Sequence, residues 1–126
     1  MYSPSYNRIE DRAELVAFMR ANSFAVLVTG TGGTLHASHL PVRINEDGND
    51  LVLDLHMAKS NPQWKEFFDD EAMVVFAGPH AYVSPRWYID RERVPTWNYA
   101  AVHAYGVPVL VQDKSRKLAS QRRLVA

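Results

Sequence analysis

Phe24-Ala-Val-Leu-Val-Thr29 is a short run of apolar and β-branched residues. Such a run is typical of a buried strand. The glycine-rich turn Gly30-Thr31-Gly32-Gly33 follows, and residues 34–42 supply a second extended segment. Because two extended segments joined by a tight glycine-rich turn pair in antiparallel fashion, we predict a β-hairpin over residues 24–42.

A second turn adds a third strand to this hairpin. Asp47-Gly48 is the strongest short turn signal in the sequence, and it leads into a strand over residues 50–57. Alternation along this strand places Asp54 and His56 on one face. The opposite face is apolar and consists of Leu51, Leu53, Leu55 and Met57.

The remaining elements are short. Apolar residues near a 3.6-residue spacing predict a helix over residues 10–22, and Asn61-Pro62 begins a short helix that runs through Phe68. Two further strands and a charged terminal helix are predicted at residues 72–77, 107–112 and 114–125. Short strands with few helices favour a mainly β fold, an antiparallel sheet closed into a small barrel.

Residues 78–106 are rich in aromatic side chains that prolines separate. We predict that residues 78–88 and 94–99 of this segment form no regular amphipathic element. Two interpretations stay open. The segment is either a rigid loop at the barrel mouth or a dimer interface, or it is the wall of a pocket for a planar aromatic ligand. In the pocket interpretation, Thr96 and Asn98 supply polar contacts.

The composition is ordinary for one globular domain. The chain has 126 residues, so we expect a single domain over residues 1–126. Its formal net charge is zero. It has no cysteine, which excludes disulfides, thiolate metal sites and cysteine nucleophiles. No apolar run approaches the ~20 residues of a membrane helix, and the N-terminus lacks a signal-peptide layout. We therefore expect a cytoplasmic protein that makes no membrane contact.

Motifs for metal or hydrolytic chemistry are weak. His36 and His39 point to opposite faces if they lie on a strand, and neither has a ligand partner at a typical spacing. Asp69, Asp70 and Glu71 form a run that is typical of a solvated turn. The sequence contains no nucleophile elbow, phosphate-binding loop or dinucleotide fingerprint. We therefore expect no metal site.

The terminal helix contains the one concentrated positive segment of the sequence. Solvated side chains near a helix C-terminus explain this segment better than DNA contact does, since no helix-turn-helix spacing accompanies it. The zero net charge also argues against broad neutralisation of phosphates. DNA contact stays open as the less favoured interpretation of Lys114, Arg116, Lys117, Arg122 and Arg123.

The segment His56-Met-Ala-Lys-Ser-Asn-Pro-Gln-Trp64 lies between the end of a predicted strand and the start of a predicted helix. Backbone N–H groups at the helix start, together with Lys59 and Ser60, form an anion site suited to phosphate. The alternative is that Ser60 or Asn61 only caps the helix.

Several motifs give the chain a resemblance to a known family. They are His39-Leu40-Pro41, His56-Met57-Ala58, Asn61-Pro62-Gln63-Trp64, Gly78-Pro79-His80-Ala81-Tyr82 and Val94-Pro95-Thr96-Trp97-Asn98-Tyr99. Over nearly its whole length the sequence resembles the PaiB-type family of FMN-binding negative transcriptional regulators. The resemblance implies a split-barrel flavoprotein fold related to pyridoxamine-phosphate oxidases, and a homodimer with two FMN molecules at the subunit interface. It also implies that the family pattern continues for several tens of residues beyond Ala126.

The resemblance further implies roles for individual residues. It assigns the FMN phosphate to Lys59, Ser60 and Asn61, and it places His56 and Ala58 beside the ribityl chain. The edge of the isoalloxazine ring lies along the backbone of Ser38, His39, Leu40 and Pro41. The residues that close over the ring, from the same or the other subunit, are Thr96, Trp97 and Asn98.

The resemblance implies FMN binding in bacterial gene regulation as the function. An FMN-dependent oxidoreductase, in which the flavin supplies the hydride chemistry, is the alternative. An open face above the flavin would favour the enzyme, and a ring covered by Trp97 and its neighbours would favour a sensor. A third interpretation is a truncated scaffold that binds no flavin, because part of the family pattern is absent.

Overall fold

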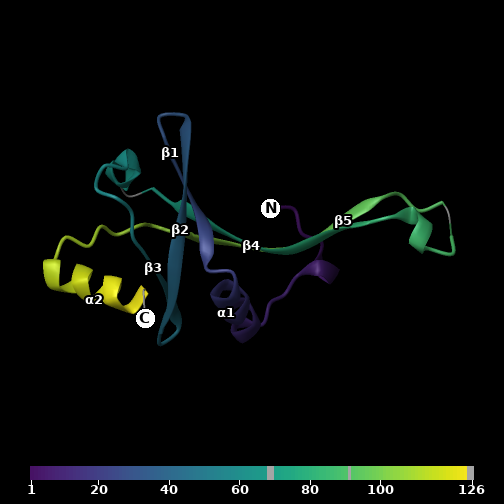
Figure 1. The fold of residues 1–126 in the computed structure, drawn as a ribbon, viewed down its shortest axis with the longest axis horizontal. Coiled ribbons are helices and arrows are strands. Elements are labelled where there is room, and N and C mark those ends of the chain that lie inside the picture. The colour runs from purple at the N-terminus through teal and green to yellow at the C-terminus, as the bar shows by residue number, and fades with distance from the viewer. Residues whose placement is uncertain (68–69, 91, 125–126) are drawn as a thin grey trace.

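The computed structural model of the chain describes residues 1–67, 70–90 and 92–124, and in these residues five strands form one antiparallel sheet (Figure 1). Its order is β3-β2-β1-β4-β5, so β3 and β5 are the outer strands. The predicted mainly β, antiparallel fold is confirmed, and this order is consistent with a split barrel. The strands are β1 (Phe24–Thr31), β2 (Thr34–Asp47), β3 (Asp50–Leu55), β4 (Ala72–Val83) and β5 (Thr96–Gly106).

Helices occupy the ends of the chain and the connections between strands. The described residues form the α-helices α1 (Arg12–Ala21) and α2 (Lys114–Leu124) and the short 3-10 helices η1 (Ser5–Asn7), η2 (Pro62–Glu66) and η3 (Pro85–Trp87). The predicted helix ends at Phe68 and Val125 lie outside the described residues, as does Asp69 of the predicted acidic turn. In the part of the chain that the structure describes, no helix is long and apolar enough to span a membrane.

The predicted hairpin of β1 and β2 is confirmed. Leu27 lies opposite Ser38 in the antiparallel register, and Gly32 and Gly33 form the turn with φ angles of 60° and 84°. Only glycine adopts such angles without strain, which explains why this turn is glycine-rich. β2 continues beyond the predicted end at Val42 and pairs with β3, so one long strand joins the two hairpins.

The core lies between α1 and one face of the sheet. Val16 and Met19 of α1 are buried against the sheet residues Leu27, Ile44 and Phe76. The helix begins where Asp11 Oδ1 accepts a hydrogen bond from the Glu14 N–H at 2.8 Å, which is a regular N-cap. An amphipathic helix on an apolar sheet face thus holds the middle of the sheet together.

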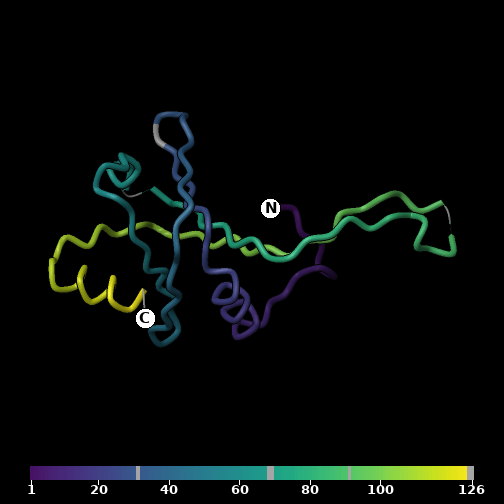
Figure 2. Tube along the Cα trace, viewed as in Figure 1, coloured from purple at the N-terminus to yellow at the C-terminus, as the bar shows by residue number. Residues whose placement is uncertain are grey.

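The prediction that residues 78–88 and 94–99 form no regular amphipathic element is wrong, because most of them lie in paired strands. β4 and β5 stay paired as far as Val83 and Thr96, and their outer part projects from the sheet as an arm, which we define as residues 79–90 and 92–99 (Figure 2). The prolines lie where strands tolerate them. Pro79 falls in a register shift between Ala77 and His80, whereas Pro85 and Pro95 lie just outside the paired segments.

A glycine marks the root of this arm. A Cβ atom on Gly78 would lie 2.6 Å from Cζ of Phe18, a residue of α1 that packs against the core. Only a residue without a side chain permits this close approach of helix and strand. The arm therefore begins where α1 stops covering the β4–β5 ladder.

Two smaller predictions of strand boundaries are also wrong. Residues 107–112 form no strand, and Pro108, which has no N–H to donate, is within this segment. β3 ends at Leu55 and not at Met57, because the next residue of β2 in this register is Pro41, which has no N–H to donate to the ladder.

Candidate functional site

The connection between β3 and η2 presents a cation and a hydroxyl to solvent. The N–H of Asn61 donates to the carbonyl oxygen of Ala58 at 2.9 Å, which closes a turn over residues 58–61. Lys59 and Ser60 occupy the middle of this turn, and both are exposed. A fixed backbone with an ammonium group and a hydroxyl group on its outer side suits the binding of an anion.

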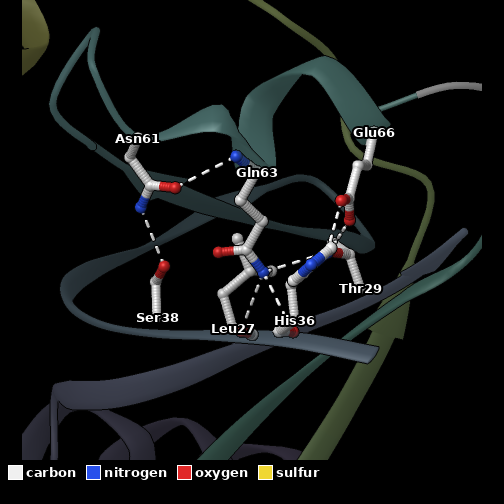
Figure 3. Close-up of polar contacts among 7 residues, drawn as sticks. All are labelled: Leu27, Thr29, His36, Ser38, Asn61, Gln63 and Glu66. Carbon is white, nitrogen blue, oxygen red and sulfur yellow. Dashed lines mark hydrogen bonds and ion pairs between the residues drawn. The ribbon is translucent and has the colours of Figure 1, made fainter. Parts of the chain in front are cut away.

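Asn61 joins this turn to the neighbouring strand (Figure 3). Its side-chain Nδ2 donates to Oγ of Ser38 at 2.9 Å, and its Oδ1 accepts from the Gln63 N–H at 3.0 Å. Two segments assigned to the same ligand from the sequence, residues 38–41 and 59–61, therefore meet through one side chain. Since the Gln63 N–H already has a partner, Asn61 is the helix cap. Lys59 and Ser60 are the exposed polar side chains of the turn.

A buried polar network holds η2 against β1 and β2, and sequence reasoning missed it. Gln63 is 2% exposed, and its Nε2 donates to the carbonyl oxygens of Leu27 and His36, both at 3.2 Å, and to Thr29 Oγ1 at 3.0 Å. Oγ1 of Thr29 donates to Glu66 Oε2 at 2.8 Å, and Glu66 Oε1 contacts Nδ1 of His36. The spacing of Gln63 and Glu66 was the available signal, because residues three apart lie on one side of a helix.

The strand assigned to the flavin edge has side chains on two faces. Ser38 and Leu40 lie opposite buried residues of β1 and share their face, whereas His39 and Pro41 lie on the other face and are exposed. His36 and His39 therefore point to opposite faces, as predicted from their spacing. Within residues 1–67, 70–90 and 92–124, no three histidine or carboxylate side chains are placed to hold a metal ion.

The face that carries His39 continues into an open, mostly apolar hollow between the β1–β2 hairpin and β4–β5. Its lining includes Val28, Leu35, Met73 and Tyr105. The hollow contains none of the site residues predicted from the sequence, and the polar groups of the turn lie on the other face of β2. The turn and not the hollow is therefore the candidate site.

Two buried polar atoms beside the turn have no protein partner among the described residues. They are Nδ1 of His56, two residues before Ala58, and Oε1 of Gln63, two residues after Asn61. Buried polar atoms without partners are rare in native proteins, and each calls for an explanation. Nδ1 of His56, together with the exposed Lys59 and Ser60, fits a ligand that carries an anionic group and hydroxyl groups.

Thr96, Trp97 and Asn98 lie in the arm and not beside the turn. Figure 1 shows η2 and the outer part of the arm at opposite ends of the molecule. Trp97 Nε1 donates to His80 Nδ1 at 3.0 Å, and the two rings stack with centroids 5.7 Å apart. A single chain therefore does not bring these three residues to Lys59.

The whole chain, residues 1–126, matches the model of the family described as "Putative FMN-binding domain". The chain belongs to this family. Its membership of the FMN-binding domain family confirms the resemblance recognised from the tryptophan and proline motifs.

Three curated relatives extend this finding. "Protease synthase and sporulation protein PAI 2" of Bacillus subtilis is 44% identical over 107 residues, which cover 84% of this chain and 51% of the relative. An uncharacterized protein of Emericella nidulans is 35% identical over 82% of this chain and 54% of its own length. An uncharacterized protein of Saccharomyces cerevisiae is 36% identical over 61% of this chain and 49% of its own length. The chain thus spans about half the length of the curated relatives it matches.

Proposed function

We propose that this chain, as a single domain over residues 1–126, binds FMN at the turn between β3 and η2. The observation that carries the proposal is the hydrogen bond of Asn61 to Ser38, because it fixes an exposed lysine and serine beside the strand assigned to the flavin ring. Family membership supports FMN as the ligand. Bound FMN would supply electron or hydride transfer, and the chain would supply its position and surroundings.

The turn supplies groups that bind the phosphate and the ribityl chain of FMN. The ammonium group of Lys59 offsets the phosphate charge, the hydroxyl of Ser60 donates to a phosphate oxygen, and Asn61 holds the turn in place. The unpartnered Nδ1 of His56 forms a hydrogen bond with a ribityl hydroxyl, and Ala58 lies beside the ribityl chain. Backbone groups of residues 38–41 contact the edge of the ring.

We further propose a homodimer in which each chain completes the other's FMN site. Thr96, Trp97 and Asn98 belong to the arm, which projects away from the end of the molecule where η2 lies (Figure 1). The arm also exposes large apolar side chains, including Trp87, Tyr99 and Val94, that lack cover within the chain. Exposed apolar patches of this kind mark interaction surfaces. A second chain would bring its arm over the flavin ring.

Substitution of Lys59 tests this function. We expect the wild-type protein to show flavin absorbance bands and to bind two FMN molecules per dimer in sedimentation equilibrium, with a clear preference for FMN over riboflavin in calorimetric titration. Lys59→Ala removes the phosphate counter-charge, and its Kd for FMN should rise about tenfold, which corresponds to about 1.4 kcal/mol. Its Kd for riboflavin, which has no phosphate, should not change.

Lys65→Ala is the matched control, because Lys65 is an exposed lysine of η2 that lies over the Trp64 ring and outside the turn. It should leave the preference for FMN in place. An unchanged FMN affinity in Lys59→Ala would contradict the phosphate assignment. A protein that stays colourless and binds no FMN at saturation would favour a scaffold without flavin.

The biological role that we favour is gene regulation. The relative from Bacillus subtilis is named for protease synthase and sporulation, and the exposed helix α2 carries five basic residues and no acidic residue. Binding of the FMN-loaded dimer to promoter DNA tests this role, and its expected mark is an affinity that falls steeply with salt.

An FMN-dependent oxidoreductase is the second candidate. The exposed side chains of His39 and Pro41 favour it, because they leave one face of the strand beside the ring open to a second reactant. Oxidation of a reduced nicotinamide by the FMN-loaded protein, followed at saturating electron acceptor, separates the two roles.

A further inference from the structure

We infer that Gln63 is a positioning residue that determines how strongly the site prefers a phosphorylated flavin. This inference rests on the proposed function, in which Lys59 and Ser60 hold the FMN phosphate. The hydrogen bonds that the Gln63 side chain donates go to Leu27, Thr29 and His36, none of which is assigned to the ligand. It acts by fixing η2, and η2 fixes the turn.

The first step is the attachment of η2 to the sheet. Gln63 is the one buried residue of η2, and its amide reaches the carbonyl oxygens of Leu27 in β1 and His36 in β2. The amide donates to Thr29 Oγ1 as well, so it crosses both strands of the hairpin (Figure 3). An amide held between two strands sets the position of η2 along them and its rotation about its own axis.

Glu66 provides a second point of attachment at the other end of η2. One carboxylate oxygen accepts from Thr29 Oγ1 at 2.8 Å, and the other contacts His36 Nδ1. Thr29 therefore accepts from Gln63 and donates to Glu66 through one hydroxyl group. Both ends of a one-turn helix are thus joined to the same place on the hairpin, which leaves the helix little freedom to tilt.

The second step connects η2 to the phosphate groups. Trp64, which follows Gln63, donates from Nε1 to the carbonyl oxygen of Lys59 at 3.1 Å. Asn61 accepts from the Gln63 N–H at its Oδ1 and donates to Ser38. Any displacement of η2 therefore moves the backbone that carries Lys59 and Ser60, whereas the ring-edge residues 38–41 are held by the β1–β2 ladder.

Because the turn is held by η2 and the ring-edge residues are held by β1, we expect loss of Gln63 to weaken phosphate binding selectively. Loss of the Gln63 donors releases the turn and weakens the phosphate contacts, but the backbone of β2 beside the ring keeps its pairing with β1. FMN and riboflavin share the ring and the ribityl chain and differ only by the phosphate. The FMN-to-riboflavin affinity ratio therefore reports on Gln63, and a general loss of stability would lower both affinities together.

The test compares both flavins on Gln63→Met, which keeps the size of the side chain and removes its donors. For the purified 126-residue chain, we expect the Kd for FMN to rise about tenfold and the Kd for riboflavin to stay within about twofold. Glu66→Gln keeps the shape of η2 and weakens its contact with His36. It should shift the ratio in the same direction by about threefold, and it serves as the test if Gln63→Met does not fold.

Two control variants lie outside the network. Ile44→Val loosens the core at the other end of the sheet, and Glu46→Gln neutralises a carboxylate of β2 that pairs with Arg20. Neither should change the affinity ratio.

Three results would overturn the inference. Equal losses of FMN and riboflavin affinity in Gln63→Met would assign Gln63 to overall stability. Unchanged affinities in both network variants would remove its role and leave the proposed function intact. Equal affinity of the wild-type protein for the two flavins would overturn the phosphate assignment and the inference together.

Discussion

The inner and outer halves of the β4–β5 ladder have the same pairing and opposite packing. In the inner half, Val74 and Phe76 are buried in the core between the sheet and α1. In the outer half, beyond the register shift at Ala77 and His80, aromatic side chains such as Tyr82 are exposed. Backbone hydrogen bonding is therefore not what distinguishes the two halves. The difference is whether another element covers the strand pair.

The described residues cover the inner half of the ladder with α1 but leave the outer half exposed. One face of the inner half belongs to the core, because Val74 and Phe76 are in the same buried cluster as Val16 and Met19 of α1. The outer half has pairs that close only within the arm, such as His80 with Trp97 and Trp97 with Tyr82. A two-stranded ribbon without cover is marginal in water, so the arm gains most from a second surface.

The largest expected effect comes from one aromatic residue of β4 in each half. Phe76 is 0% exposed, and Phe76→Ala should lower the free energy of unfolding by about 3–5 kcal/mol, because it leaves a cavity in the core. Tyr82 lies on the same strand beyond the register shift and is 46% exposed. Tyr82→Ala should lower the free energy of unfolding by less than about 1 kcal/mol in dilute solution.

Urea unfolding at two protein concentrations measures both effects. Similar losses at low concentration would contradict the contrast between the halves. A Tyr82→Ala effect that grows with protein concentration would sharpen it, since the arm would then contribute to a dimer.

The next effect tests the boundary between the halves. Gly78→Ala places a Cβ atom 2.6 Å from the ring of Phe18, so the ring must shift within the core. We expect a loss of about 1–3 kcal/mol in the free energy of unfolding. Phe18→Leu removes the outer atoms of the ring, and the double variant should lose less than the sum of the single variants. Additive losses would show that the close approach is not the cause.

The smallest effect concerns α2, which, like the arm, exposes most of its residues. The Arg116 N–H, at 2.8 Å, and then the Ser115 hydroxyl lower the pKa of Asp113 at the helix start. A lowered pKa means that the ionised cap stabilises the helix above the ordinary aspartate range near pH 4. This contribution is lost as the pH falls through the lowered pKa.

Helical ellipticity at 222 nm measures this change during acidification. The wild-type protein should lose a small part of its signal in the acid range, whereas Asp113→Asn keeps a capping side chain without a charge and should lack that step. Identical acid profiles for the two proteins would show that the charge of Asp113 does not stabilise α2.

The sequence predicted local features well and contacts between distant segments poorly. The β1–β2 hairpin follows from an apolar run and glycines at Gly32 and Gly33, both of which are local signals. The regular pairing of the arm was missed, because alternating aromatic residues with prolines resemble a loop unless the partner strand is known.

The candidate site shows the same division. The motif that contains Lys59 and Asn61 was recognisable as a local pattern, whereas the bonds of Gln63 to Leu27 and Thr29 join residues 36 and 34 positions apart. Sequence separation of this kind leaves no periodic pattern. The three-residue spacing placed Gln63 and Glu66 on one side of η2, but it did not identify the strands against which Gln63 is buried.

The bond between Trp64 and Lys59 also gives the molecule an optical reporter. Trp64 is half-buried, and its indole N–H donates to the backbone of the turn that carries the proposed phosphate groups. The other two tryptophans, Trp87 and Trp97, lie exposed on the arm. When both are replaced by phenylalanine, the remaining emission comes from the turn alone. Flavins absorb at the wavelengths where indole emits, so quenching of this emission would follow the arrival of FMN at the turn, and its recovery would follow release.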